Sequence, residues 1–233
     1  MMAKSQCLNL KVTKSNKVMK NSVIGLVGAS GFGSEVMPLL EAQTLKSSTI
    51  NSQLVFIDSD QSKTNLLGHE IITEESFLQL ESKDKFFNIS VADPEVRKAI
   101  QKRILAHNIK PISIFSEDIR CLASVEFGEG AIVCPHALFT SNIQIGSFFH
   151  CNYKSAIAHD CTVGDFVTLA PGVFINGNVT IEDEVYIGAG AVIKQGVTVG
   201  KNSVIGMGAV VLKDVIEGTT VVGNPAKEMK RNK

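Results

Sequence analysis

The chain has 233 residues, 44% of them hydrophobic, and its 23 Lys and Arg residues balance its 23 Asp and Glu residues. This length and composition predict one large or two modest globular domains and exclude a disordered chain. Because balanced charge gives no net field for nucleic acid or a membrane surface, we expect neither as a partner. No apolar stretch approaches the ~20 residues needed to span a bilayer, so cytoplasmic localisation is expected.

The first 20 residues carry five lysines among polar residues and lack the apolar centre of a secretory signal. The sequence does not decide whether this leader is a loose arm or an additional strand.

Residues 22–115 alternate short apolar runs with helical stretches. The run Val23–Val27 predicts a buried strand, and a helix from Glu35 follows, with Pro38 in its first turn. Further strands are expected at 54–57, 86–91 and 112–115, and a helix at 94–107. Parallel strands with helical crossovers place ligands at the carboxyl ends of the strands. We therefore predict an α/β domain with half of a Rossmann fold that binds a nucleotide sugar.

A glycine turn joins the first predicted strand to the first helix and consists of Gly28, Ala29, Ser30, Gly31, Phe32 and Gly33. Its backbone amides are placed to face a phosphate, although a turn that only permits close packing is the alternative. Asp58 ends the second strand, where a carboxylate can accept from a ribose hydroxyl or a base imide, and Asp60 competes for this role. So short a sheet suits a nucleotide attached to another group better than a complete dinucleotide.

Within residues 120–226, apolar residues recur every six positions. Twelve of them are Ile145, Cys151, Ile157, Val163, Leu169, Ile175, Ile181, Ile187, Ile193, Val199, Ile205 and Val211. A period of six is typical of a solenoid of short strands in which one residue per segment points to a shared axis. Because three segments make one coil of about eighteen residues, residues eighteen apart are expected to stack. This half is predicted to be a β-solenoid.

The cysteines and histidines do not predict a metal site or a disulfide framework. Four of the five cysteines fall inside the repeat where small apolar residues are wanted, which favours buried free thiols in a reducing compartment. Zinc held by His136, His150 and His159 is disfavoured, because their spacings of 14 and 9 do not match a stack of eighteen.

His159 is the candidate catalytic residue of the repeat. It follows the inward-pointing Ile157 by two residues, which places it near a corner, and Asp160 can orient its ring. An imidazole can accept the proton that an attacking amine or hydroxyl loses, whereas a bystander surface histidine is the alternative. A neighbouring stack of small residues is expected to form a shallow trench along the outside of the solenoid. The alternative is that these residues serve only at corners of the chain that need a positive φ. This stack contains Asn152, Ala170, Gly188 and Gly206.

These features resemble the bacterial hexapeptide-repeat acetyltransferases of the sialic acid O-acetyltransferase and UDP-amino-sugar N-acetyltransferase group, in particular the UDP-N-acetylbacillosamine type. The resemblance extends from Ser22 to Lys230 and rests on the glycine turn and on residues 158–165, 170–172, 177–178 and 222–226. It implies a left-handed parallel β-helix, against the usual crossover rule. It also implies a homotrimer with acetyl-CoA between neighbouring β-helices and active sites between subunits.

The resemblance assigns roles by position. His159 matches the general base, Asp160 its acidic partner, and Asn152 a residue that contacts the sugar. The nucleotide site, which holds a uridine nucleotide in the family, is expected at Gly28, Ser30, Gly31, Phe32, Gly33 and Asp58. The acetyl-CoA site is expected at Thr168, Gly177, Asn178, Gly188 and Gly206, with the Gly177 amide meeting the thioester carbonyl. Phe32 and Thr168 stand where the family commonly has histidines.

The sequence therefore predicts an acetyl-CoA-dependent N-acetyltransferase that modifies the 4-amino group of a UDP-linked trideoxy sugar for surface glycan biosynthesis. The amine attacks the thioester directly, His159 accepts its proton, and no metal or acyl-enzyme takes part. Two alternatives are O-acetylation of a sialic acid or another sugar, and a non-catalytic subunit that binds nucleotide sugars.

Overall fold

The computed structural model describes residues 10–12, 22–46, 52–82 and 84–229. They belong to two compact units, one within residues 14–115 and the other formed by residues 116–233 together with the segment up to Thr13. No helix within the described ranges is both long and apolar enough to cross a bilayer.

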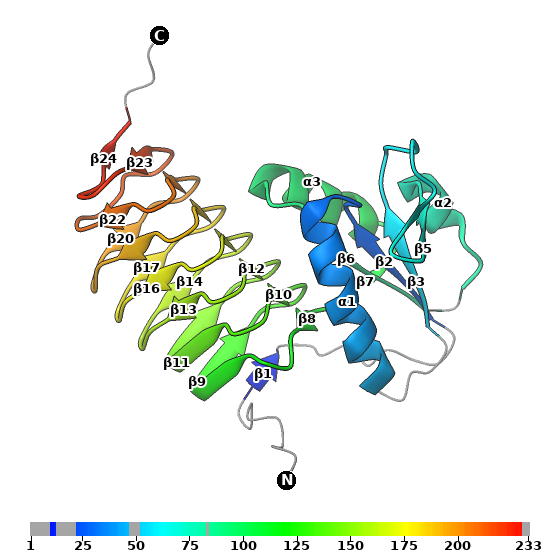
Figure 1. Cartoon of the computed structure of the whole chain (residues 1–233), viewed down its shortest axis with the longest axis horizontal. Coiled ribbons are helices and arrows are strands. Elements are labelled where there is room, and N and C mark those ends of the chain that lie inside the picture. Colours follow the sequence, from blue (N-terminus) through cyan, green and yellow to red (C-terminus); the bar gives the residue numbers. More distant parts are fainter. Residues whose placement is uncertain (1–9, 13–21, 47–51, 83, 230–233) are drawn as a thin grey trace. The chain divides into compact units, whose positions relative to one another are not determined.

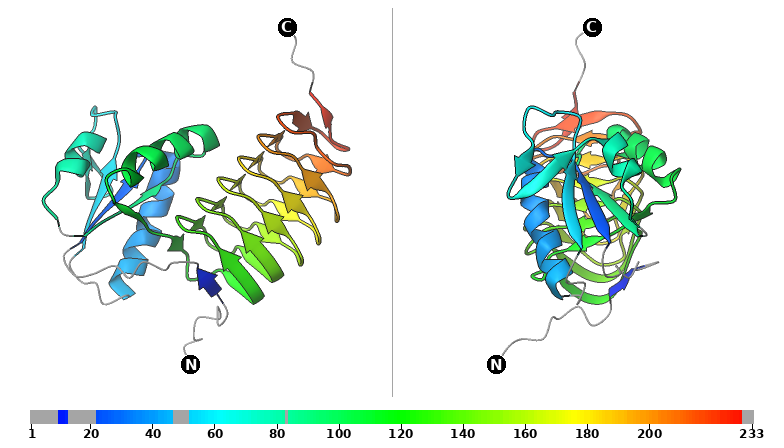
Figure 2. Two further views of the ribbon diagram at one scale, coloured as in Figure 1. Left: turned by 180° about the vertical axis from the view of Figure 1, so that it is seen from behind. Right: turned by 90° about the vertical axis from the view of Figure 1, so that its right-hand side faces the viewer.

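The 14–115 unit is an α/β domain whose parallel strands follow the order β5-β3-β2-β6-β7, with β4 antiparallel to β5 at one edge (Figure 1). Its strands are β2 (Val23–Val27), β3 (Gln53–Ile57), β4 (Asn65–Leu66), β5 (His69–Ile72), β6 (Lys85–Ile89) and β7 (Lys110–Pro111). Its helices are α1 (Gly31–Lys46), α2 (Glu74–Gln79) and α3 (Pro94–Leu105). The strand expected at 112–115 to close this sheet is present only as β8 (Ile114–Phe115), which is not part of the sheet, and β7 forms its edge instead. Helices α1 and α3 lie on opposite faces of the sheet (Figure 2).

Local chemistry explains most of these elements. Every residue of β2 is buried, as expected for the central strand of a parallel sheet. Helix α3 begins after Asp93, whose carboxylate accepts from the Val96 amide, and Pro94 occupies its first turn. The prediction for α1 was wrong at its start: the helix begins at Gly31, so Pro38 lies inside it and not in its first turn. The exposed ring of Pro38 removes one helical hydrogen bond but avoids the core.

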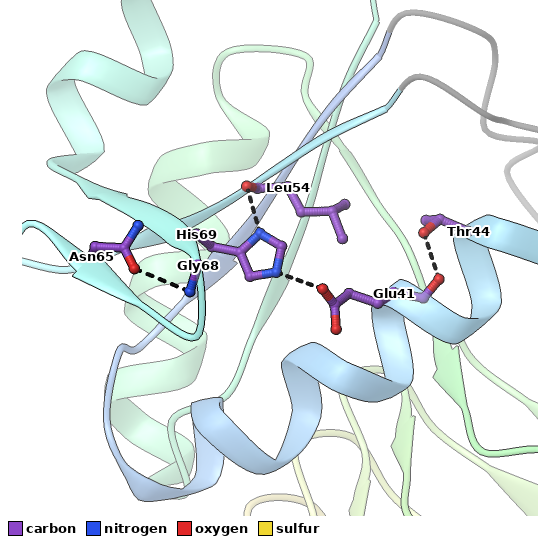
Figure 3. Close-up of polar contacts among 6 residues, drawn as sticks. All are labelled: Glu41, Thr44, Leu54, Asn65, Gly68 and His69. Atoms are coloured by element: carbon purple, nitrogen blue, oxygen red, sulfur yellow. Dashed lines mark hydrogen bonds and ion pairs between the residues drawn. The ribbon is translucent and has the colours of Figure 1, made fainter.

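A histidine–glutamate pair joins the β4–β5 hairpin to α1 (Figure 3). His69 at the start of β5 places Nε2 2.8 Å from the Glu41 carboxylate and Nδ1 3.2 Å from the Leu54 carbonyl oxygen. The tip of the hairpin is held by the Gly68 amide, which donates to the Asn65 side chain. Neither this hairpin nor helix α2 is predicted from the sequence.

The second unit is a parallel β-helix in which each coil contributes short strands (Figure 1). Its strands are β1 (Leu10–Val12), β9 (Arg120–Phe127), β10 (Ile132–Val133), β11 (Leu138–Ile145), β12 (His150–Cys151), β13 (Ala156–Ile157), β14 (Thr162–Val163), β15 (Thr168–Leu169), β16 (Phe174–Ile175), β17 (Thr180–Ile181), β18 (Tyr186–Ile187), β19 (Val192–Ile193), β20 (Thr198–Val199), β21 (Val204–Ile205), β22 (Val210–Val211), β23 (Thr220–Val222) and β24 (Lys227–Glu228). Strand β1 pairs with β9, so part of the leader is a strand, and its other residues lie outside the described ones.

The stacking distance of eighteen residues is confirmed by the strand pairing. Ala156 pairs with Phe174, Thr162 with Thr180, and each next coil repeats the offset until the last turn. The coils therefore form a three-sided prism, with one face of β13, β16, β19 and β22, one of β14, β17 and β20, and one of β12, β15, β18 and β21.

Every sixth residue from 130 to 208 has a left-handed backbone and turns the chain around a corner of the prism. Three columns result. The column next to His159, here named the His159 corner, contains Asn142, Asp160, Asn178 and Gly196. The column next to Asn152, here named the Asn152 corner, contains His136, Lys154, Gly172, Gly190 and Gly208. The third corner contains Gly130, Phe148, Phe166, Glu184 and Asn202.

The core of the prism confirms the predicted inward positions. All twelve residues of the six-residue repeat are buried, at 6% exposure or less. Cys121, Cys134, Cys151 and Cys161 are buried and form no disulfide among the described residues, outside which Cys7 lies. Burial of these side chains along one axis stabilises coils whose strands of two residues could not fold alone.

Candidate active site

The His159 corner joins a histidine, a carboxylate and an amide in one chain of hydrogen bonds. His159 Nδ1 lies 2.7 Å from Asp160 Oδ2, and the Asn142 side-chain amide donates to Asp160 Oδ1 over 2.7 Å. The His159 and Asp160 side chains are 52% and 50% exposed, so both face solvent and not the core. A carboxylate accepts from Nδ1–H, which leaves the lone pair of the imidazole on Nε2.

The next coil closes over the His159 ring. A Cβ atom added to Gly177 would lie 2.5 Å from His159 Cε1 and 2.6 Å from Nε2, so the ring rests against the Gly177 backbone. The Asn178 amide donates to the His159 carbonyl oxygen over 2.8 Å. Within the described residues the Gly177 N–H has no acceptor. The structure thus brings together four of the predicted site residues, His159, Asp160, Gly177 and Asn178, and their roles stay predictions.

The electrostatics of the corner favour a negative Asp160. The hydrogen bond from Asn142, followed by that from His159, lowers the pKa of the Asp160 carboxyl below its ordinary value. By contrast, burial raises the pKa of the neighbouring Cys161 thiol, which therefore remains protonated at neutral pH. A protonated, buried thiol is a poor nucleophile.

Asn142 is a member of this corner that the sequence analysis missed. It lies eighteen residues before Asp160, the distance at which residues of adjacent coils stack. The stacking rule could have found it, because it places an amide donor directly beside the candidate carboxylate.

The other predicted residues of the β-helix lie away from His159 within one chain. Asn152 is at the Asn152 corner, where its side chain donates to the Leu169 carbonyl oxygen over 3.2 Å. Thr168 is in β15, on the face that does not border the His159 corner. A Cβ atom added to Gly188 would lie 2.6 Å from the Met207 backbone nitrogen, and one added to Gly206 would lie 2.7 Å from the Val222 side chain. The adjacent coil therefore accounts for both glycines, and contact with acetyl-CoA stays a prediction.

The glycine turn opens α1 with free donors. Gly28 has φ of 102°, and the carbonyl oxygen of Gly28 is so close to Gly33 that no Cβ fits there. Within the described residues, the N–H groups of Ser30, Gly31 and Gly33 have no acceptor, and an added Cβ at Gly31 would meet nothing within 4 Å. Open backbone at a helix N-terminus is suited to a phosphate.

Asp58, which is expected to contact a ribose or base, makes hydrogen bonds within the protein, and the expected contact stays a prediction. Its carboxylate accepts from the Ala29 amide over 2.7 Å and from the Asp60 amide over 3.0 Å. Asp58 therefore holds the glycine turn in shape, and it also lines an adjoining cavity.

That cavity has a volume of about 500 Å³ and lies at the carboxyl ends of β2 and β3. Val27, Ile57 and Val91 give it apolar walls, and an ion pair that the sequence analysis missed lines it as well. Both nitrogens Nε and Nη2 of Arg103 donate to the Glu74 carboxylate, over 2.9 and 2.8 Å. The cavity can enclose a flat ring, whose faces would contact the apolar walls and whose polar edge atoms would meet Arg103 and Glu74.

No three or more His, Cys, Asp or Glu side chains in the described part of the chain are grouped so as to hold a metal ion.

Comparison with known proteins identifies the family. Residues 23–104 match the PglD N-terminal domain, and residues 178–213 match the hexapeptide repeat of succinyl-transferase. The chain is 41% identical over 216 residues to GDP-perosamine N-acetyltransferase of Escherichia coli O157:H7, which covers 91% of this chain and 98% of that protein. The chain belongs to the PglD-type hexapeptide-repeat sugar N-acetyltransferases.

Two solved structures of similar proteins cover both units of this N-acetyltransferase. WeeI from Acinetobacter baumannii AYE has a TM-score of 0.85 and 43% identity, over 90% of this chain and all of that one. The acetyltransferase domain of PglB from Neisseria gonorrhoeae, in complex with acetyl coenzyme A, has a TM-score of 0.81 and 29% identity, again over 90% and 100%.

Proposed function

We propose that this N-acetyltransferase moves the acetyl group of acetyl-CoA directly to the primary amine of a nucleotide-linked amino sugar, with His159 as general base. The observation that carries the proposal is the 2.7 Å contact between His159 Nδ1 and the Asp160 carboxylate. Nε2 has no hydrogen bond within the described residues, so its lone pair is available to a substrate proton.

The reaction needs no covalent intermediate, because an uncharged amine is itself a nucleophile. The amine nitrogen attacks the thioester carbonyl, and His159 Nε2 accepts its proton as the new C–N bond forms. Asp160 stabilises the resulting imidazolium. The C–S bond then breaks, the proton passes from the imidazolium to the CoA sulfur, and the products are the sugar acetamide and free CoA.

Gly177 is proposed to stabilise the oxyanion through its backbone N–H. That N–H has no acceptor within the described residues and belongs to the residue against which the His159 ring rests. One aligned donor of this kind contributes roughly 3 kcal/mol of transition-state stabilisation in a shielded site.

The acceptor is proposed to be the 4-amino group of a UDP-linked 2-acetamido-4-amino-trideoxy sugar, which the family resemblance implies. Two features of the 14–115 unit support a nucleotide: the open amides of the glycine turn and the cavity of about 500 Å³ beside it. A GDP-linked amino sugar is the second candidate, favoured by the 41% identity to GDP-perosamine N-acetyltransferase.

A homotrimer with active sites between subunits is part of the proposal. One face of the prism carries an outward row of apolar side chains, here named the apolar face: Leu138, Ala156, Phe174, Val192 and Val210. The neighbouring face instead carries Thr162, Thr180 and Thr198. Phe174 is 52% exposed, and packing against further copies would remove the row from water.

The two corners that border the apolar face carry His159 and Asn152. Packing of this face against a second copy can therefore bring Asn152, with Gly188 and Gly206, toward the His159 of a neighbouring subunit. This arrangement would place acetyl-CoA between adjacent β-helices.

The test is thiol release from acetyl-CoA with UDP-, GDP- and dTDP-linked 4-amino-4,6-dideoxy sugars and with free sialic acid. We expect rapid release with one nucleotide-linked amino sugar and an acetamide in the product by NMR. Release only with sialic acid would favour the O-acetyltransferase. Binding of nucleotide sugar without any thiol release would favour a non-catalytic subunit.

A further inference from the structure

The Asp160 carboxylate has a separate partner for each of its oxygens. Oδ2 is 2.7 Å from His159 Nδ1, and Oδ1 accepts from the Asn142 amide at 2.7 Å. The backbone adds a third link, because the Asp160 amide donates to the Ser141 carbonyl oxygen over 3.0 Å. Asp160 is thus tied to the preceding coil by main chain and side chain together.

An exposed carboxylate needs such a link to keep one orientation. The Asp160 side chain is 50% exposed, so without a second partner it would turn freely between His159 and water. The Asn142 side-chain amide donates to one oxygen of the carboxylate, and the other oxygen is left to accept from His159. Because Nδ1 is oriented by that oxygen, the position of Nε2 depends on Asn142.

The backbone at Asn142 is adapted to this role. Asn142 and Asp160 have φ of 55° and 59°, a conformation that Asn and Asp adopt more readily than other residues with a Cβ. Asn178, one coil further on, has φ of 57°, but within the described residues its side chain makes no hydrogen bond. The conformation alone therefore does not explain the contact at Asn142.

We propose that Asn142 is a positioning residue for the reaction: its side-chain amide holds the Asp160 carboxylate so that His159 presents Nε2 to the acceptor amine. The inference rests on the proposed role of His159 as base. Asn142 acts through Asp160, so it sets the orientation and charge environment of the imidazole.

Two substitutions at Asn142 are expected to move the pH profile in different directions. Asn142→Asp keeps the shape and the left-handed backbone but places a second carboxylate beside Asp160 and His159. Added negative charge favours the imidazolium, so the acid limb of kcat/KM moves to higher pH. Asn142→Gly keeps the backbone and frees Asp160, so the acid limb moves to lower pH. In both variants we expect kcat to fall about 10-fold, by analogy with the lower end of the loss seen when the outer partner of a metal-ligating histidine is removed.

Asn202 supplies matched controls. It has φ of 56° and lies at the third corner, so Asn202→Asp and Asn202→Gly make the same chemical change away from His159. Both controls should keep the kcat and the acid limb of the unaltered enzyme. Thermal melts of all four variants separate loss of folding from loss of positioning.

Three results would overturn the inference. The first is a pH profile and kcat for Asn142→Asp equal to those of Asn202→Asp. The second is a loss at Asn142→Gly explained fully by a lower melting temperature, with normal kcat in the folded fraction. The third is normal turnover by His159→Asn, which would overturn the proposed base and this inference together, whereas an inactive His159→Asn with normal Asn142 variants overturns the inference alone.

Discussion

Replacement of Gly177 by alanine should disable the enzyme without unfolding it. The new Cβ would lie 2.5 Å from His159 Cε1 and 2.6 Å from Nε2, whereas ordinary contacts begin at 3.4 Å. The imidazole must therefore move by about 0.9 Å, and a displacement near 1 Å costs roughly 100-fold in rate, or about 2.7 kcal/mol of barrier. Since Gly177 does not have a positive φ, alanine fits the backbone there and can stabilise the fold by about 0.4–1 kcal/mol.

The assay for Gly177→Ala is kcat for thiol release together with a thermal melt and the NMR shift of the His159 Cε1 proton. We expect a rate near 1% of the original, a melting temperature that is unchanged or higher, and a shifted ring resonance. In a His159→Ala background the same change should have no further effect on rate, because no ring remains to be displaced. Unaltered kcat in Gly177→Ala would refute the assignment of Nε2 as the reacting atom.

Three further changes test separate parts of the site. Asp160→Asn should lower kcat by at least ~100-fold, because an amide no longer selects the Nδ1–H tautomer. The hydrogen bonds of Asp160 lower the pKa of its carboxyl below the ordinary value of 3.8. The ionised carboxylate therefore stabilises the folded protein above pH 3.8, and this contribution is lost as the pH falls through the lowered pKa of the folded state. At such low pH the difference in melting temperature between the unaltered protein and Asp160→Asn should vanish. Asp58→Asn should raise the KM for the nucleotide sugar about 10-fold, since the glycine turn loses a charged hydrogen-bond acceptor, and should leave the KM for acetyl-CoA unchanged. Asp60→Asn, at a residue outside the cavity, is the control. Equal KM values for the nucleotide sugar in the two variants would contradict the role of Asp58. Phe174→Asp should dissociate the trimer in sedimentation analysis, whereas Thr180→Asp on the neighbouring face should not; a monomeric unaltered protein would contradict the proposed assembly.

The repeat made the β-helix predictable in detail. A period of six requires one inward side chain per segment, and those positions are the buried ones in the structure. The acetyl-CoA-dependent N-acetyltransferase predicted from the sequence is confirmed by the family to which the chain belongs. The choice of UDP over GDP stays a prediction, because a protein 41% identical to this chain is a GDP-perosamine N-acetyltransferase.

Features that depend on contacts between neighbouring coils are harder to predict from the sequence. Gly188 and Gly206 form a column of small residues in the sequence, yet the adjacent coil already occupies the space beside them. The link from Asn142 to Asp160 joins residues of ordinary polar character that only the eighteen-residue stack brings together.

The α/β unit was harder to predict where its signals are short. Helix α1 starts at Gly31 although glycine has low helix propensity. The glycine at position 33 is required because the Gly28 carbonyl oxygen leaves no room for a side chain there. The β4–β5 hairpin consists of strands of two and four residues and depends on the contact of His69 with Glu41. Such tertiary contacts have no periodic signature.

The most direct test of the account is single-turnover acetyl transfer by the unaltered enzyme and by His159→Asn, with acetyl-CoA and the nucleotide-linked amino sugar both saturating. Asparagine cannot accept the amine proton, so the account predicts a loss of at least ~100-fold in the chemical step with no change in assembly or melting temperature. Transfer by His159→Asn at a rate near that of the unaltered enzyme would contradict it.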